Sequence, residues 1–218
     1  MNIRFRPLLL CLSATVFVHM GAGIPATAQQ QQPDLGALLQ GIMQGANQKT
    51  QDAPALVNFR ELKAQLPAEL PDMKRISASG EKTGAFGMSV AFAEATYRGE
   101  DGGTISIKIT DSGGMPGVAA MAQAGFAATE IDRETETGYE RTTTIEGHRA
   151  LEQYDSRYES GSIMIMAKKR LSFEVKGNQV PMEAVHAAVD ALDFEAISGL
   201  IEKAQKEAEE AEAASAEE

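Results

Sequence analysis

The sequence predicts an α+β domain in which helices pack on an antiparallel sheet of about six to seven strands. Runs of alternating apolar and polar residues follow one another through short turns, which is the pattern of strands joined by hairpins. Helical periodicity occurs before, between and after these runs, so helices and sheet are expected to form layers around one core. We expect this domain to span residues 57–201 of the 218-residue chain.

The first half of the domain begins with a short helix. Asn58 followed by Glu61 is typical of a helix N-terminus, and Pro67 ends the helix. The best strand pattern of the chain comes later, where Ile105 and Ile109 belong to an alternating run that predicts one buried and one solvated face. Strand-like runs of this half cover three ranges: 73–83, 88–97 and 104–110.

The second half begins with an alanine-rich helix predicted over residues 115–126, with Val118, Met121 and Ala122 directed inward. Pro181 suits the first turn of a last helix, whose apolar stripe continues after a break near Asp193. Strand-like runs between these helices cover four ranges: 139–145, 150–158, 163–165 and 171–175. In the second of these runs, the residues expected to face the core are Leu151 and Tyr154.

Residues 1–28 resemble a signal peptide. Two arginines precede an apolar run over residues 8–18, and Ala26-Thr27-Ala28 supplies the small residues of a cleavage site. We therefore expect export, to the periplasm or to the exterior of the cell, without an integral membrane anchor after processing. Cys11 would leave with the peptide, so the mature chain would contain neither a disulfide nor a cysteine nucleophile.

The charge balance excludes two classes of partner. The chain has 20 Lys+Arg against 31 Asp+Glu, and cleavage would remove two arginines and no acid. Nucleic acids and anionic membrane surfaces both attract basic proteins, so neither is an expected partner.

The segment 29–56 reads as a linker that contains a short amphipathic helix. Its apolar stripe has helical spacing and consists of Leu35, Leu38, Leu39, Ile42 and Met43. Such a stripe must be buried against something: its own domain, a partner protein, or, with less support from its flanking residues, a membrane. It is the candidate partner-binding segment of the chain.

Residues 202–218 form an acidic tail rich in alanine and glutamate. Its composition favours a helix, but acids crowd the end where the helix dipole prefers cations, so we expect a helix that extends outward and frays. The tail is either simply solvated or a binding segment for a basic partner.

Three short stretches carry a resemblance to a known group. Leu66-Pro67 leads out of the first helix, the run 93–97 reads Ala-Glu-Ala-Thr-Tyr, and the run 146–150 reads Glu-Gly-His-Arg-Ala. Over roughly residues 57–200 this order resembles the PsbP-like α/β/α group, which includes many small exported bacterial proteins with no assigned activity. The resemblance implies an α/β/α layered fold and a non-enzymatic accessory or assembly role, and it transfers no functional residue.

No catalytic, cofactor-binding or metal-binding set stands out. His148 lies in a turn, and His186 lies on the last helix beside Val185 and Val189, so neither histidine indicates a metal or catalytic site. The acids of the stretch 130–140 alternate along one strand face and are too widely spaced for one ion to bridge several of them. The glycines of 113–117 lack the Lys-Ser/Thr pair of a phosphate loop.

The sequence therefore favours an exported, non-catalytic accessory domain that binds or helps to assemble an unidentified partner protein, in an oligomeric state left open. The alternative is a module that binds a small ligand, a lipid or a metabolite, in a pocket lined by Tyr97, Met121 and Tyr154. A third hypothesis, a hydrolase, requires His148 to meet a serine and an acid in space.

Overall fold

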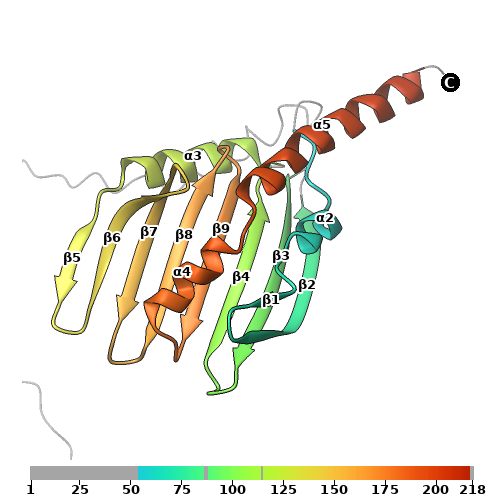
Figure 1. Ribbon diagram of the computed structural model, residues 1–218. Coiled ribbons are helices and arrows are strands. Elements are labelled where there is room, and N and C mark those ends of the chain that lie inside the picture. The colour runs from blue at the N-terminus through green and yellow to red at the C-terminus, as the bar shows by residue number, and fades with distance from the viewer. Residues whose placement is uncertain (1–53, 86–87, 114, 217–218) are drawn as a thin grey trace, which may run out of the picture.

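The computed structural model describes residues 54–85, 88–113 and 115–216 (Figure 1). The predicted signal peptide, the stripe from Leu35 to Met43 and most of the predicted linker lie outside these residues. The helices are α2 (Phe59–Ala64), α3 (Pro116–Ala128), α4 (Met182–Asp190) and α5 (Phe194–Ala216). The strands are β1 (Glu69–Leu70), β2 (Met73–Ala85), β3 (Met88–Gly99), β4 (Thr104–Asp111), β5 (Asp132–Thr135), β6 (Gly138–Ile145), β7 (His148–Asp155), β8 (Ser160–Ala167) and β9 (Leu171–Asn178).

The strands form one open antiparallel sheet, which confirms the predicted α+β class. Its order is β1-β2-β3-β4-β9-β8-β7-β6-β5, so two meanders meet where β4 pairs with β9. Within the described residues the sheet has nine strands rather than six to seven. The two additional strands are β1, which is only two residues long, and β5, which is exposed along its whole length. Neither carries the apolar alternation by which strands are recognised in a sequence.

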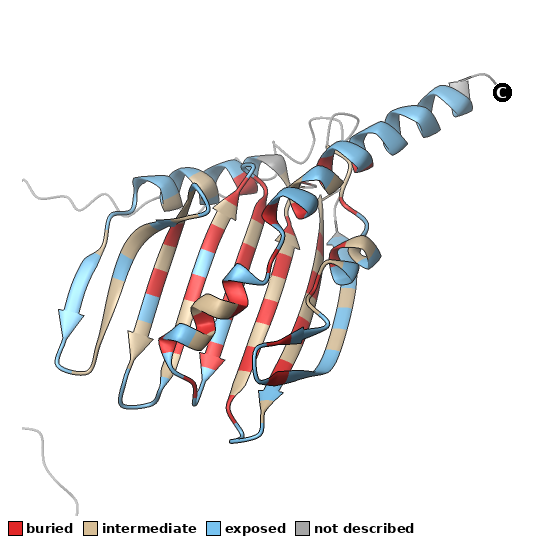
Figure 2. Ribbon diagram, in the orientation of Figure 1, coloured by how far each residue is buried: buried red, intermediate tan, exposed pale blue. Residues whose placement is uncertain are grey.

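One face of the sheet, here called the helix face, carries the core. Ile105, Ile107 and Ile109 of β4 are buried there and alternate with half-buried polar residues, as predicted. Figure 2 shows the same alternation along β8 and β9. α4 packs on β4, β8 and β9, and α2 packs on β2 and β3. Together they cover the centre and one side of this face (Figure 1).

The helix ends follow local sequence signals. The side chain of Asn58 accepts a hydrogen bond of 3.0 Å from the backbone N–H of Arg60, so α2 begins at Phe59. Pro181 precedes the first residue of α4, and a break separates α4 from α5 as predicted. α5 runs through the predicted domain end at residue 201. Its last buried residue is Ala204, and the remainder extends away from the sheet (Figure 1).

The inward position predicted for Leu151 is wrong. On β7 the helix face receives Ala150, Glu152 and Tyr154, and Leu151 stands on the opposite face beside Met164 of β8. Because side chains alternate along a strand, Leu151 and Tyr154 cannot both point inward from one regular strand. The buried side chain at the centre of this strand is a carboxylate instead of a leucine.

A buried ion pair joins the two meanders at the β4–β9 junction. The guanidinium of Arg170 donates two hydrogen bonds to the carboxylate of Asp111, from Nε at 2.7 Å and from Nη2 at 2.6 Å. The backbone N–H groups of Val57 and Gly113 donate to the same carboxylate at 2.8 and 2.9 Å. Arg170 also donates to the carbonyl oxygen of Ala55 at 2.8 Å. The pair therefore connects the segment before α2, the end of β4 and the β8–β9 turn.

Gly113 makes room for this ion pair. A Cβ atom at residue 113 would lie 2.1 Å from both Cζ and Nη2 of Arg170, much closer than non-bonded atoms approach. The glycine is thus required by the guanidinium packed against it.

We predict that Arg170→Met lowers the free energy of unfolding by about 3 kcal/mol or more, because it leaves the Asp111 carboxylate buried without a counter-ion. Urea unfolding of the purified protein measures the change. The double variant Asp111→Ala/Arg170→Met should recover part of the loss, since no uncompensated charge remains.

The matched control is Arg133→Met, which breaks an ion pair with Glu140 in which the arginine side chain is 67% exposed. It should cost less than about 1 kcal/mol. If Arg133→Met and Arg170→Met lowered the free energy of unfolding equally, the buried pair would contribute no more to stability than the exposed pair.

Candidate functional site

The face of the sheet opposite α2 and α4, here called the polar face, carries the candidate site. Side chains from adjacent strands stand next to one another there because the strands pair in register. One line crosses eight strands and is here called the polar row: Ser77, Thr96, Ser106, Lys176, Ser162, Gln153, Glu140 and Arg133. Every member is polar or charged.

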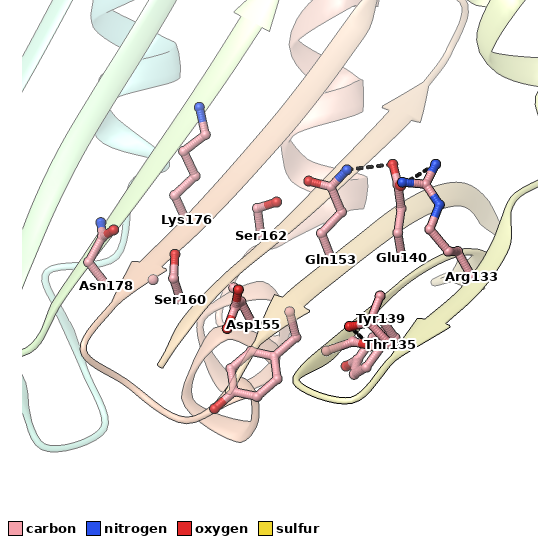
Figure 3. Close-up of a pocket in the computed structure, with 14 residues that line it drawn as sticks. Arg133, Thr135, Tyr139, Glu140, Gln153, Asp155, Ser160, Ser162, Lys176 and Asn178 are labelled. Carbon is pink, nitrogen blue, oxygen red and sulfur yellow. Dashed lines mark hydrogen bonds and ion pairs between the residues drawn. The ribbon is translucent and has the colours of Figure 1, made fainter. Parts of the chain in front are cut away.

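An open hollow of about 420 Å³ lies on the polar face over strands β5 to β9. Figure 3 shows Lys176, Ser162, Gln153 and Glu140 in a line on the same side of neighbouring strands. A second line of side chains, two residues nearer the strand ends than the polar row, completes the hollow with Asp155, Ser160 and Asn178. The register of five strands therefore builds the site, without any special loop.

The charged groups of the hollow already have partners. Glu140 accepts from Nε2 of Gln153 at 2.6 Å and pairs with Arg133 at 3.1 Å. Lys176 pairs with Glu174 on its own strand at 2.6 Å. Within the described residues, the side chains of Ser160, Ser162 and Asn178 make no hydrogen bond. The hollow thus offers unengaged hydroxyl and amide groups between neutralised charges, which suits a polar ligand without strong net charge.

The C-terminal end of α3 is attached to the polar face. The carbonyl oxygen of Thr129 accepts hydrogen bonds from the guanidinium of Arg149 and from Oγ1 of Thr142, and both donors stand on this face. α2 and α4 pack on the other face of the sheet.

A second polar cluster lies on the helix face, at the edge of α4. Glu152 is 1% exposed, and its Oε1 accepts from the hydroxyl of Tyr139 at 2.5 Å and from Nη2 of Arg141 at 2.8 Å. Nε2 of His186 lies 3.4 Å from Oε2 of Glu152. This carboxylate therefore joins β6, β7 and α4, and its satisfied oxygens indicate a structural clasp.

Burial raises the pKa of Tyr139 to about 12, and the hydrogen bond to Glu152 acts in the same direction. A tyrosinate next to the Glu152 carboxylate would place two negative charges together, which is why the neutral hydroxyl is favoured. Burial also raises the pKa of Tyr97, whose hydroxyl donates to the carbonyl oxygen of Pro67 at 2.8 Å.

The structure does not bring the predicted pocket residues together. Tyr97 is fully buried on β3, and Tyr154 lies on β7 at the far side of the sheet centre. Met121 on α3 is 66% exposed, so its predicted inward position is wrong. α3 is so rich in alanine that its apolar pattern does not distinguish one face from another. Of the three, only Tyr154 borders the hollow, and its side chain points to the helix face.

The histidines take separate places. His148 packs beside the ring of Phe194, with 6.1 Å between ring centroids, and makes no described contact with a serine or an acid. The carboxylate next to His186 is that of Glu152, which comes from strand β7 and not from the helix that carries His186. Of the acids of the stretch 130–140, Asp132 and Glu134 lie on β5, the exposed edge strand. No group of three or more potential metal ligands occurs within the described residues.

Sequence reasoning missed the polar row and Glu152. A signal for Glu152 was present, because it lies between Ala150 and Tyr154 at the two-residue spacing of one strand face. The polar row has no such signal, because it depends on the registers of seven successive strand pairings, one of which, β4 with β9, joins strands far apart in the sequence.

No protein-family model matches the chain, and no curated protein or solved structure matches it. The resemblance to the PsbP-like group therefore stays a prediction. Among the described helices, none has the length and apolar character needed to span a membrane.

We predict that Tyr139→Phe removes the latest step of an alkaline titration followed by tyrosinate absorbance. An ordinary tyrosine ionises near pH 10, whereas Tyr139 stays protonated to about pH 12. Because the folded state holds this proton more tightly than the unfolded state, the hydroxyl contributes stability below pH 10 that is lost as the pH rises toward 12.

Tyr158, which is 65% exposed, supplies the control. Tyr158→Phe should leave the late step of the titration unchanged. A late step that survives in Tyr139→Phe would contradict the assignment.

Proposed function

We propose that the protein is an exported, non-catalytic accessory domain that presents its polar face to a partner protein. The observation that carries this proposal is the polar row, which crosses eight strands. At a strand spacing of about 4.8 Å, eight strands give a surface about 34 Å wide. A standard protein interface buries about 800 Å² on each partner, and a surface of this width accommodates it.

The chemistry of the polar face supports binding over simple solvation. An antiparallel sheet often leaves one face in water, so polarity alone would be unremarkable. Here, however, short hydroxyl side chains alternate with ion pairs across a continuous surface, and several members are only half exposed. Protein interfaces bury such neutralised polar groups at lower cost than isolated charges.

The proposal also includes export of the protein and an α/β/α arrangement of its layers. The signal-peptide pattern over residues 1–28 supports periplasmic localisation, and the attachment of the α3 end to the polar face favours the α/β/α layering of the PsbP-like group. The stripe from Leu35 to Met43 remains a second candidate segment for the same partner.

The test places a photo-crosslinking amino acid at residue 153 of the full chain in living cells. Light should give one adduct of defined size, because Gln153 stands at the centre of the hollow. Adding Ser162→Arg should abolish this adduct, since a long charged side chain would then project from the neighbouring strand. Gel mobility and mass spectrometry follow the product.

The control places the crosslinker at residue 195, an exposed position of α5 away from the polar face. It should give no adduct of that size. Equal amounts of adduct at residues 153 and 195 would contradict recognition by the polar face. So would an adduct at residue 153 that Ser162→Arg leaves unchanged.

The hollow supports a second candidate function, the binding of a small polar metabolite through Ser160, Ser162 and Asn178. A thermal-shift screen would then show one compound class raising the melting temperature by several degrees. Ser160→Tyr, which fills the hollow, should abolish the shift. A shift that persists in this variant would place the ligand elsewhere.

A further inference from the structure

β2 has an outer edge that is mostly unpaired. The strand runs from Met73 to Ala85 and pairs with β3 over nearly its whole length. On the other side, β1 pairs only with Met73 and Lys74. From Arg75 onward, no described residue forms a strand against this edge. Backbone N–H and C=O groups on such an edge are available to another strand.

The two edges of the sheet differ in protection. β5 is four residues long and carries Asp132, Arg133 and Glu134, which is how natural sheets block pairing by another chain. The outer stretch of β2 is longer, contains no proline, and is uncharged from Ile76 to Gly80. Ile76, at an irregularity in the register with β3, is 52% exposed. This edge lacks most of the usual protection.

A basic groove lies directly beside the unpaired edge. It has a volume of about 680 Å³ and is enclosed by α2, the segment after it and β2. Its lining contains three cations, Arg60, Lys63 and Arg75, and no carboxylate. None of the three forms an ion pair within the described residues. In a chain with a formal net charge of −11, such a local excess of positive charge is a distinct feature.

Neighbouring groups hold two of these cations in place. Nη1 of Arg75 donates to the carbonyl oxygens of Leu66 and Pro67 at 3.2 and 3.0 Å. The guanidinium of Arg60 lies 4.4 Å from the centre of the Phe59 ring. The acid of α2, Glu61, instead forms an ion pair with Lys203 of α5. The groove therefore keeps its positive charge.

We propose that this edge binds an extended acidic segment of a partner protein. The segment adds to β2 as a further strand, and its carboxylates reach Arg60 and Lys63 across the groove. Backbone hydrogen bonds supply affinity, and the cations select for acidic side chains. The inference rests on the proposed partner-binding function but assigns it a second surface, separate from the polar face.

A second copy of this chain fits the edge less well. Antiparallel pairing of two β2 strands about a two-fold axis would place both helix faces on the same side of the joined sheet. The two basic grooves would then flank one junction and repel each other. The chain's own acidic residues from Glu202 to Glu212 lie in helix α5 and are not extended.

The experiment uses the processed full-length chain and three labelled peptides of equal length. The first alternates glutamate with valine, the second alternates lysine with valine, and the third keeps the glutamates but replaces the valines with proline. Fluorescence anisotropy should show binding of the first peptide, with the other two weaker by about ten-fold or more. Hydrogen exchange should slow at residues 77–83 when the first peptide is bound.

Matched variants test the groove. Arg60→Glu/Lys63→Glu should weaken binding of the first peptide by about ten-fold or more, and the milder Arg60→Gln/Lys63→Gln should weaken it less. Arg157→Glu/Lys206→Glu reverses two exposed cations elsewhere and should leave binding unchanged. The melting temperature of each variant shows whether it is folded.

Two outcomes would overturn the proposal. Equal binding of the valine and proline acidic peptides would mean electrostatic attraction without strand addition. Slow exchange before peptide is added, at those amides of residues 77–83 that do not pair with β3, would mean that the outer edge is already occupied. The occupant would be a second copy if light scattering gives twice the monomer mass, and the chain itself if it does not. Ser162→Arg should bind the peptide normally, so failure at this edge and failure at the polar face are separate results.

Discussion

The fold depends on a buried ion pair at the place where its two halves meet. Asp111 ends β4 and Arg170 precedes β9, so the pair lies at the junction through which two meanders become one sheet. Two backbone N–H groups complete the coordination of the carboxylate, and the arginine also holds the segment before α2. Charges this deeply buried are tolerated only when hydrogen bonds satisfy them. The chain therefore has to bring three distant segments together at once, and this requirement aligns the two halves.

Much of the fold could be predicted from local sequence patterns. The strand containing Ile105 to Ile109, the helix start at Asn58 and the break near Asp193 all carry signals within a few residues. The ion pair could not be predicted, because its members are 59 residues apart and each looks like an ordinary turn residue. The edge strand β5 was missed for a different reason: a strand exposed on both faces has no apolar alternation to detect.

The candidate site was harder to predict than the fold. Tyr97, Met121 and Tyr154 were chosen as aromatic or flexible apolar side chains, yet the first is inside the core and the second is exposed. The hollow consists instead of serines, amides and paired charges, which are common on any surface. Only their alignment across strands makes them a site, and alignment follows from register. A single sequence contains no direct information about the register of a strand pair. The positions of β6 and β9 relative to each other depend on three successive registers, because β7 and β8 lie between them.

Neighbouring residues of one strand serve two different purposes: one stabilises the fold, and the next belongs to the surface proposed for binding. On β7, Glu152 points to the helix face and clasps α4 through His186, while Gln153 points to the polar face and joins Glu140 in the hollow. On β6, Tyr139 likewise points to the helix face and bonds to Glu152, and Glu140 points to the polar face and bonds to Gln153. A one-residue shift in pairing would exchange the two sets, burying the recognition groups and exposing the clasp. The buried carboxylate of Glu152, which is satisfied in only one register, therefore also fixes the polar row on the opposite face. The surface proposed for binding, on one side of the sheet, thus relies on hydrogen bonds made on the other.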